Sequence, residues 1–332
     1  GARRARALAA LPAQGETVPM TRAQSLRTGL LPCLLVALLA AGCRDAKDES
    51  TSSALVPSGL AAGGCTGPDQ AFTPGQGSAL VPLATALDDW SQVTAAGDSE
   101  TLYLTAAGAV VEVDLSGGAP VETELVSAVA VTALLDGVDI AAPPRLSGVA
   151  VLDESAVLVV EHSSNTLLAV DRSGSGAVGF YAGEPNETGG FADGAAVAVP
   201  GFSAARFACS EPGGLVAVDP ADGRVFVADT GNHALRVIQQ GFVSTLAGSG
   251  SAFFADGELQ QAGFDTPVGL TVTCSGTLLV AEAGTAGAGG HRLRRIVLGP
   301  SSFFGQQGTV FTLVGDGTPA TVEGNGTLAQ VA

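Results

Sequence analysis

The chain has 332 residues, among them 46 glycines and 17 prolines, and a formal net charge of −17 at pH 7. A chain of this length can bury one sizeable core, and its high glycine and low Lys/Glu/Gln content favours strands and turns over helices. Nucleic acids are excluded as partners, because binding them relies on Lys and Arg that neutralise phosphates.

The N-terminal segment has the pattern of an export signal. Met20 is the only methionine in the chain, so residues 1–19 are expected to lie upstream of the true start. Basic residues then precede a short apolar run, residues 29–42, which ends at Cys43. This run is shorter than the ~20 helical residues that a membrane span needs. The end of the run resembles a bacterial lipobox, which implies a lipoprotein-type signal peptide over residues 20–42 and lipidation of Cys43.

The lipobox has one departure and one alternative. Ala40 stands where a lipobox usually carries leucine, and an ordinary secretory signal cut nearby is the alternative. With a lipid on Cys43, the protein is expected to be exported and held at the outer membrane or cell surface; otherwise it is periplasmic or extracellular. Residues 43–80 are rich in Gly, Ser and Pro and predict a flexible tether that holds a folded domain away from the membrane.

Residues 81–332 contain an internal repeat. Three copies begin near Gly148, Gly214 and Gly269, and a weaker copy precedes them. Each copy has short runs of β-branched and aliphatic residues separated by Asp/Gly turns, which predicts strands rather than helices. Four short antiparallel strands per repeat form one blade of a β-propeller, so the predicted fold class is all-β. The predicted blades lie near residues 90–129, 146–183, 212–248 and 267–315.

The stretch VFVADTGNHALRVI (residues 225–238), followed by VSTLAGSGSAFFADG and a later Pro-Val-Gly-Leu, resembles the NHL repeat family of β-propellers. The resemblance covers roughly residues 146–326. It implies a propeller that closes with six blades, of which about four are visible. We therefore expect a propeller that is incomplete at its C-terminus.

One triplet in this stretch, Asp229-Thr230-Gly231, resembles the catalytic segment of acid proteases. Those enzymes need two such carboxylates, and the chain has a single copy of the triplet. We interpret it as a turn in which Asp229 accepts backbone N–H groups and in which Gly231 and Asn232 tolerate positive φ. The predicted structural turn residues are Asp229, Gly231, Asn232, His233, Asp256 and Gly257.

Three histidines suggest a second kind of chemistry. Amidating lyases with a related propeller bind zinc through histidines from separate blades, and His162, His233 and His291 offer the same residue type. However, His162 aligns with Thr230 and not with His233, so a shared site is not expected. Calcium at the Asp-Gly turns is a further weak alternative. We expect no metal or other cofactor and no catalytic residue.

The cysteines left after the signal are Cys65, Cys209 and Cys274, which allow one disulfide at most. Cys209 precedes the first strand of its predicted blade and Cys274 follows one, so the two are expected on opposite faces. Any bridge is therefore predicted to use Cys65.

The mature chain has one basic cluster, which contains Arg292, Arg294 and Arg295. These residues are candidates for binding an acidic partner, although offsetting nearby carboxylates is the favoured interpretation. The predicted function is a non-catalytic scaffold that binds a protein or a cell-envelope glycan, with membrane contact through the lipid anchor only. The alternative is a secreted propeller enzyme, of the metal-dependent lyase or lactonase type, whose site lies partly in further blades.

Overall fold

The computed structural model describes residues 92–96, 100–117, 119–140, 143–200, 203–209, 215–273, 275–284, 290–299, 307–319 and 326. The predicted signal peptide, the lipidation site Cys43, the tether, Cys65 and Cys274 lie outside these residues.

Four antiparallel sheets make up the described part of the chain. The first sheet contains β1 (Val93–Ala95), β2 (Thr101–Ala106), β3 (Ala109–Asp114) and β4 (Val121–Val126). The second contains β5 (Leu146–Val151), β6 (Ala156–Glu161), β7 (Thr166–Asp171) and β8 (Val178–Ala182). The third contains β10 (Val216–Val218), β11 (Val225–Asp229), β12 (Ala234–Gln239) and β13 (Phe242–Gly248). The fourth contains β15 (Pro267–Val272), β16 (Leu278–Glu282), β17 (Arg292–Leu298) and β18 (Gly308–Val314).

Short elements connect the sheets. The helix α2 (Ala128–Leu134) follows β4, and its N-terminus is capped by the Ser127 side chain, which accepts a hydrogen bond from Ala130 N. The two-residue strands β9 (Gly194–Ala195) and β14 (Gly257–Glu258) pair with β13 and β18, and so cover the outer edges of the third and fourth sheets. Within the described ranges, no helix is long and apolar enough to cross a membrane.

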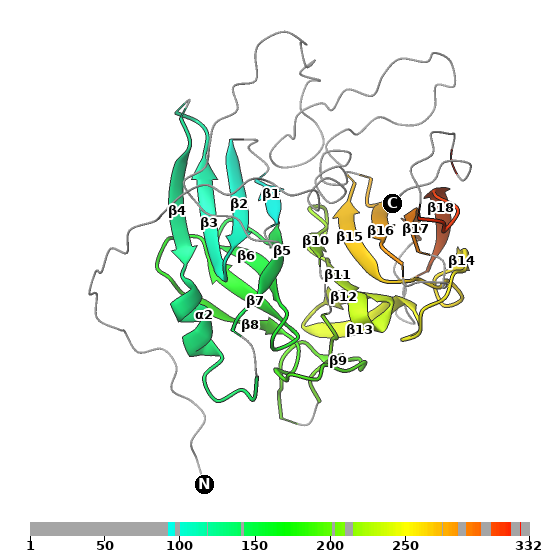
Figure 1. Ribbon diagram of the computed structural model, residues 1–332, viewed down its shortest axis with the longest axis horizontal. Helices are drawn as coiled ribbons and strands as arrows, with labels where there is room; N and C mark the ends of the chain where they lie inside the picture. The colour runs from blue at the N-terminus through cyan, green and yellow to red at the C-terminus, as the bar shows by residue number, and fades with distance from the viewer. Residues whose placement is uncertain are drawn as a thin grey trace.

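The sheets follow one another around a centre, as the predicted β-propeller requires (Figure 1). Strands of each sheet pair in chain order, and the innermost strands β1, β5, β10 and β15 contact one another in sequence. The prediction of an all-β propeller is therefore confirmed, with four blades in the described part of the chain.

The hydrophobic core lies between successive sheets. One cluster of buried residues joins the first and second sheets, another the second and third, and a third the third and fourth. Because the second and third sheets have a neighbour on both faces, their central strands are buried almost without interruption, as the patterns of β6 and β11 show. This explains why these strands appear in the sequence as continuous apolar runs rather than as alternating ones.

Candidate functional site

The carboxylate of Asp229 is fully buried where β11 ends. Its Oδ1 accepts hydrogen bonds from the backbone N–H of Ala208 (2.8 Å) and from Asn232 Nδ2 (3.0 Å), and its Oδ2 accepts one from Arg236 Nη1 (2.9 Å). Burial raises the pKa of this carboxyl, while these hydrogen bonds and the Arg236 charge oppose the rise. The carboxylate thus has a structural role, but the backbone donor comes from the segment that enters the third sheet and not from the turn itself.

The turn after β11 differs from the prediction in one respect. Residues Thr230–Asn232 form a short 3-10 helix, and the residue with positive φ is His233 (φ 48°), not Gly231 or Asn232. Asn165 (φ 56°) and His291 (φ 56°) adopt the same conformation. Asn165 lies at the equivalent place after β6, and His291 lies just before β17. In the second, third and fourth sheets, a residue other than glycine therefore adopts the left-handed conformation just before the third strand.

The side chain at the left-handed position links one sheet to the next. His233 Nδ1 accepts a hydrogen bond from the backbone N–H of Thr266 (3.0 Å), the residue just before β15. Because Nδ1 accepts, the proton of the neutral ring is on Nε2. In the preceding sheet, Asn165 Oδ1 accepts a hydrogen bond from the N–H of Cys209 (2.8 Å), which precedes β10. We call these two contacts the blade links; the sequence analysis missed them.

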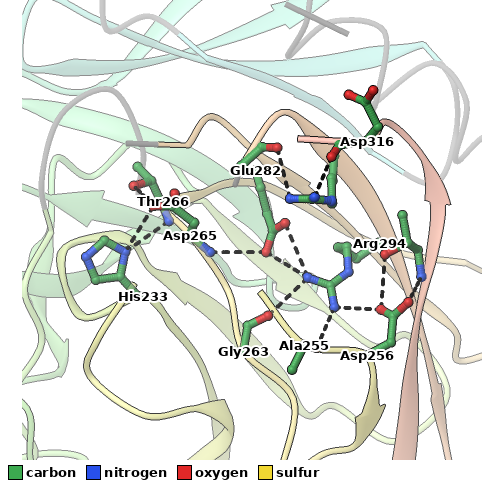
Figure 2. Close-up of polar contacts among 12 residues, drawn as sticks. His233, Ala255, Asp256, Gly263, Asp265, Thr266, Glu282, Arg294 and Asp316 are labelled. Atoms are coloured by element: carbon green, nitrogen blue, oxygen red, sulfur yellow. Dashed lines mark hydrogen bonds and ion pairs between the residues drawn. The ribbon is translucent and has the colours of Figure 1, made fainter. Parts of the chain in front are cut away.

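A fully buried arginine occupies the centre of the fourth sheet's polar network (Figure 2). Arg294 Nη1 donates to Glu282 Oε1 (3.1 Å) and to the carbonyl of Gly263 (3.0 Å). Its Nη2 donates to Asp256 Oδ1 (2.7 Å) and to the carbonyl of Ala255 (2.8 Å). Arg294 thereby fixes the loop between the third and fourth sheets onto β16 and β17.

The third sheet contains the same arrangement around Arg236. Its Nη1 donates to Asp229 and to the carbonyl of Arg206 (3.0 Å), and its Nη2 donates to Asp193 Oδ1 (2.7 Å) and to the carbonyl of Ala192 (2.7 Å). We call Arg236 and Arg294, each with its two carboxylates, the arginine clamps. The sequence Phe-Ala-Asp-Gly occurs at residues 191–194 and again at residues 254–257, and these two stretches lie in the loops that the clamps hold.

The clamp is missing from the second sheet. Leu168 lies at the position of Arg236, seven residues after the carboxylate that ends the second strand. That carboxylate, Glu161, instead accepts hydrogen bonds from the backbone N–H groups of Arg145 (3.0 Å), Ser163 (2.9 Å) and Ser164 (2.7 Å). Backbone donors thus satisfy the buried acid where no arginine is present.

The carboxyl of Glu282, at the end of β16, has a pKa well above its usual value. Burial raises its pKa to about 7, against the opposing effect of the Arg294 charge and of a hydrogen bond from the N–H of Asp265. The other carboxylate partner of Arg294, Asp256, is more exposed and also accepts hydrogen bonds from the Thr312 hydroxyl and backbone N–H. Arg294 therefore has a second carboxylate partner in addition to Glu282.

The predicted basic cluster divides into buried and exposed residues. Arg292 is buried, stacks on the ring of Phe254 (3.8 Å from its centroid) and donates to the carbonyl of Asp316 (2.6 Å). Burial lowers its pKa. Arg294 is held in its clamp, whereas Arg295 points to solvent. As expected from strand alternation, Arg292 and Arg294 share one face and Arg295 lies on the other. Only Arg295 is therefore positioned to meet an acidic partner.

The histidines lie in separate environments. His162 Nε2 contacts the Ser147 hydroxyl (2.6 Å) and its Nδ1 contacts the carbonyl of Cys209 (3.0 Å), whereas His233 is used in a blade link. Across the part of the chain that the structure describes, no three His, Cys, Asp or Glu side chains lie in a metal-binding arrangement. Cys209 is a buried free thiol whose pKa is raised by that burial.

The comparisons with known proteins agree with the repeat seen in the third sheet. The NHL repeat model matches residues 213–238, so the resemblance to NHL propellers is confirmed there. The Protein SUPPRESSOR OF QUENCHING 1, chloroplastic, of Arabidopsis thaliana is 38% identical over 63 residues, which are 18% of this chain and 6% of that protein.

Solved structures similar to the chain include three bacterial proteins. A protein of unknown function from Bacteroides thetaiotaomicron has a TM-score of 0.49 and 17% identity, over 70% of this chain and 50% of that one. An auxiliary nutrient binding protein of the same organism has a TM-score of 0.40 and 18% identity, over 54% and 42%. Virginiamycin B lyase from Staphylococcus aureus has a TM-score of 0.34 and 14% identity, over 68% and 71%. The chain spans 6% of the Arabidopsis protein and half or less of the two Bacteroides proteins.

Proposed function

We propose that this protein is a non-catalytic binding scaffold, exported and lipid-anchored at Cys43, whose propeller binds a protein or a glycan of the cell envelope. The observation that carries the proposal is a set of exposed phenylalanine rings that the arginine clamps hold in place. Export and lipid anchoring rest on the sequence pattern that ends at Cys43.

The rings come from equivalent loops of adjacent sheets. Phe191 and Phe254 are each 42% exposed, and Phe253, beside Phe254, is 37% exposed. The guanidinium of Arg236 lies 5.1 Å from the centroid of Phe191, and that of Arg294 lies 4.9 Å from the centroid of Phe254. Because the two clamps are equivalent, the two rings lie on the same rim of the propeller, one blade apart. We call Phe191, Phe253 and Phe254 the phenylalanine rim.

This rim suits binding for two physical reasons. Each stacked ring has one face on a buried cation and presents its remaining surface to solvent, so its orientation is fixed before a partner arrives. Aromatic side chains contribute large apolar contact areas to interfaces. Such a surface fits the apolar side chains of a protein or the C–H faces of a sugar.

The buried polar residues support a scaffold in a second way. Asp229, Glu282, Arg236 and Arg294 are buried and bonded to one another and to backbone groups, so their charges stabilise the loops. Carboxylates used in this way hold a rigid frame and do not face a substrate.

The proposal is tested by binding measurements with matched variants. Purified protein is applied to an array of peptidoglycan fragments and lipopolysaccharide oligosaccharides, and to a displayed peptide library. We expect one of the two probe sets to bind, and the Phe191→Ser/Phe254→Ser variant to lose at least about tenfold in affinity. Val129→Ser is the control, because Val129 is 78% exposed and lies in α2, which follows the first sheet. Equal binding by the rim variant and the control contradicts the proposal.

Metal analysis separates the scaffold from the metal-dependent enzyme. A scaffold is expected to stay folded and to keep binding its probe in excess chelator. One tightly held zinc or calcium ion per chain, with loss of probe binding on its removal, contradicts a metal-free scaffold.

A further inference from the structure

The phenylalanine rim has an exposed carboxylate beside each of its two clamped rings. Asp193 follows Phe191 by two residues, and Asp256 follows Phe254 at the same spacing. The side chain of Asp193 is 53% exposed and that of Asp256 is 40% exposed. Each clamped ring therefore has a solvent-exposed acid as its neighbour.

One guanidinium holds the ring and the carboxylate of the third sheet together. The guanidinium of Arg236 lies 5.1 Å from the centroid of Phe191, and its Nη2 donates to Asp193 Oδ1 (2.7 Å). The hydroxyl of Thr245 donates to the same oxygen (2.8 Å). The ring and the carboxylate thus keep one relative position before a partner arrives.

The fourth sheet repeats this arrangement one blade further on. The guanidinium of Arg294 lies 4.9 Å from the centroid of Phe254, and its Nη2 donates to Asp256 Oδ1 (2.7 Å). We call Phe191 with Asp193, and Phe254 with Asp256, the ring–carboxylate pairs. The rim therefore presents the same combination of an apolar ring and an acid twice.

The charge around the rim has one sign. The two loops that contain the rim, residues 183–209 and 249–266, include one basic residue, Arg206. Its Nε donates to Glu184 Oε2 (2.7 Å), so a neighbouring acid already pairs with it. The exposed or half-exposed acids of these loops are Glu184, Glu187, Asp193, Asp256 and Glu258. Together with the net charge of −17 of the whole chain, they favour a cationic partner and repel an anionic one.

A basic side chain matches both parts of a ring–carboxylate pair. Lysine and arginine have an apolar methylene stem and a cationic head. The stem can cover the exposed surface of the phenylalanine ring while the head meets the aspartate beside it. An aliphatic side chain contacts only the ring, and an acidic side chain brings a like charge to the aspartate.

We propose that the phenylalanine rim binds a basic segment of a partner protein, with one lysine or arginine side chain on each ring–carboxylate pair. This inference rests on the proposed function, because it names the partner of the same rim. Glycans that carry phosphate or carboxylate groups, and anionic lipid surfaces, are repelled by the exposed acids. A neutral glycan can stack on the rings but does not gain from the negative charge of the loops.

The first test measures the affinity of the purified full-length protein for three synthetic peptides of equal length. One peptide alternates leucine with lysine, one leucine with serine, and one leucine with glutamate. The leucine–lysine peptide is expected to bind at least about tenfold more tightly than the leucine–serine peptide, because an ion pair forms at each ring–carboxylate pair. Equal affinity for the three peptides, or tightest binding of the leucine–glutamate peptide, overturns the inference.

Matched variants assign the binding to the ring–carboxylate pairs. Asp193→Asn/Asp256→Asn is expected to lose about tenfold in affinity for the leucine–lysine peptide and to keep its affinity for the leucine–serine peptide. An asparagine oxygen still accepts from the clamp arginines, so the loops should stay in place. The control is Glu124→Gln/Glu154→Gln, which removes the same number of charges at exposed positions of β4 and of the turn after β5. An equal loss in the control means that the peptide responds only to the net charge of the chain, and overturns the inference.

A second pair of substitutions applies if the aspartate variant does not fold. Glu187→Gln/Glu258→Gln changes two exposed acids of the same loops that belong to neither clamp. This variant is expected to lose about threefold in affinity for the leucine–lysine peptide, because its carboxylates act from a greater distance. No loss relative to the control overturns the inference.

The outcomes distinguish this inference from the proposed function. If Phe191→Ser/Phe254→Ser binds every probe as the wild type does, the rim is not the binding surface and the proposed function fails. If that variant loses binding to a glycan of the array while the leucine–lysine peptide binds neither protein, the scaffold stands and the basic segment is overturned. Rim-dependent binding to phosphatidylglycerol vesicles likewise overturns it and assigns the rim to a membrane surface.

Discussion

Arg236 and Arg294 occupy the same position in consecutive sheets, and each binds four matching partners: the acid that ends the second strand, an aspartate of the connecting loop, and two loop carbonyls. Each is fully buried. In each guanidinium Nη1 and Nη2 are paired, whereas the buried Nε has no hydrogen-bond partner in the described part of the chain. Because burying unpaired donors is costly, the paired Nη groups specify where the connecting loops lie.

Removing one clamp is expected to be strongly destabilising. Arg294→Met leaves Glu282 buried without its main charged partner and should lower the free energy of unfolding by about 3 to 5 kcal/mol, measured by urea denaturation. Arg295→Met, at the neighbouring exposed position, should change it by no more than about 0.5 kcal/mol.

The double variant Arg294→Met/Glu282→Gln checks the cause. This variant removes the buried carboxylate charge together with its arginine partner, so it should recover part of the unfolding free energy that Arg294→Met loses. If it is as unstable as the two single losses added, packing rather than charge pairing explains the effect.

The pKa of Glu282 predicts a pH dependence of stability. Because this pKa is raised from the usual 4.5 to about 7 in the folded protein, the folded state binds a proton that the unfolded state has released between these values. The Glu282 contribution to stability is therefore present below about pH 4.5 and is lost as the pH rises to about 7. Urea denaturation from pH 4 to pH 8 should show this decline.

Glu282→Gln isolates that contribution. The variant should show a flatter dependence of stability on pH over the same interval, whereas Glu258→Gln, at an exposed position of β14, should follow the wild type. An unchanged slope in Glu282→Gln means that Glu282 does not titrate in this range.

The blade link at His233 predicts a difference between two substitutions. His233→Ala removes the acceptor for the Thr266 N–H and should lower the free energy of unfolding by about 1 to 2 kcal/mol. His233→Asn should lose less, because asparagine tolerates positive φ and Asn165 makes the equivalent bond. If urea denaturation shows equal losses of unfolding free energy in the two variants, the His233 ring contributes through packing and not as a hydrogen-bond acceptor.

Two glycines with positive φ distinguish backbone strain from close contact. A Cβ at Gly248 would lie 2.5 Å from the carbonyl oxygen of His233, whereas a Cβ at Gly241 would meet nothing within 4 Å. Gly241→Ala should therefore show only the left-handed penalty of about 1 to 2 kcal/mol. Gly248→Ala should lose about 1 to 3 kcal/mol more from the forced backbone shift. Thermal unfolding of both variants measures the difference, and equal midpoints would mean that β12 and β13 separate easily at this point.

The strands and the fold could be predicted from sequence because they depend on local patterns. Runs such as residues 225–228 are apolar and β-branched, and the Asp/Gly turns between them recur at similar places in each repeat. Likewise, the single copy of the Asp-Thr-Gly triplet led to its interpretation as a turn. The Asp229 carboxylate is bound to structural partners, in agreement with that interpretation.

The clamps and links could not be predicted in the same way, because their partners are distant in sequence. Arg236 binds Asp193, and His233 binds the N–H of Thr266, so neither contact leaves a short-range spacing. The left-handed residue was assigned to Gly231 or Asn232 because glycine and asparagine usually adopt positive φ. The sequence does contain one signal of the clamps, because Arg236 aligns with Arg294 and Asp193 aligns with Asp256 when the repeats are superimposed.

Leu168 lies in the second sheet where the third and fourth sheets have an arginine, and this difference has a consequence for how the molecule tolerates mutation. Each clamp binds its own sheet and the loop beside it, so its loss is felt by nearest neighbours and not by the whole ring. A blade can therefore have an apolar residue at this position, as the second sheet does, while the third and fourth sheets have an arginine. Substitutions in one repeat can therefore accumulate independently of the other repeats, while the packing between successive sheets is kept.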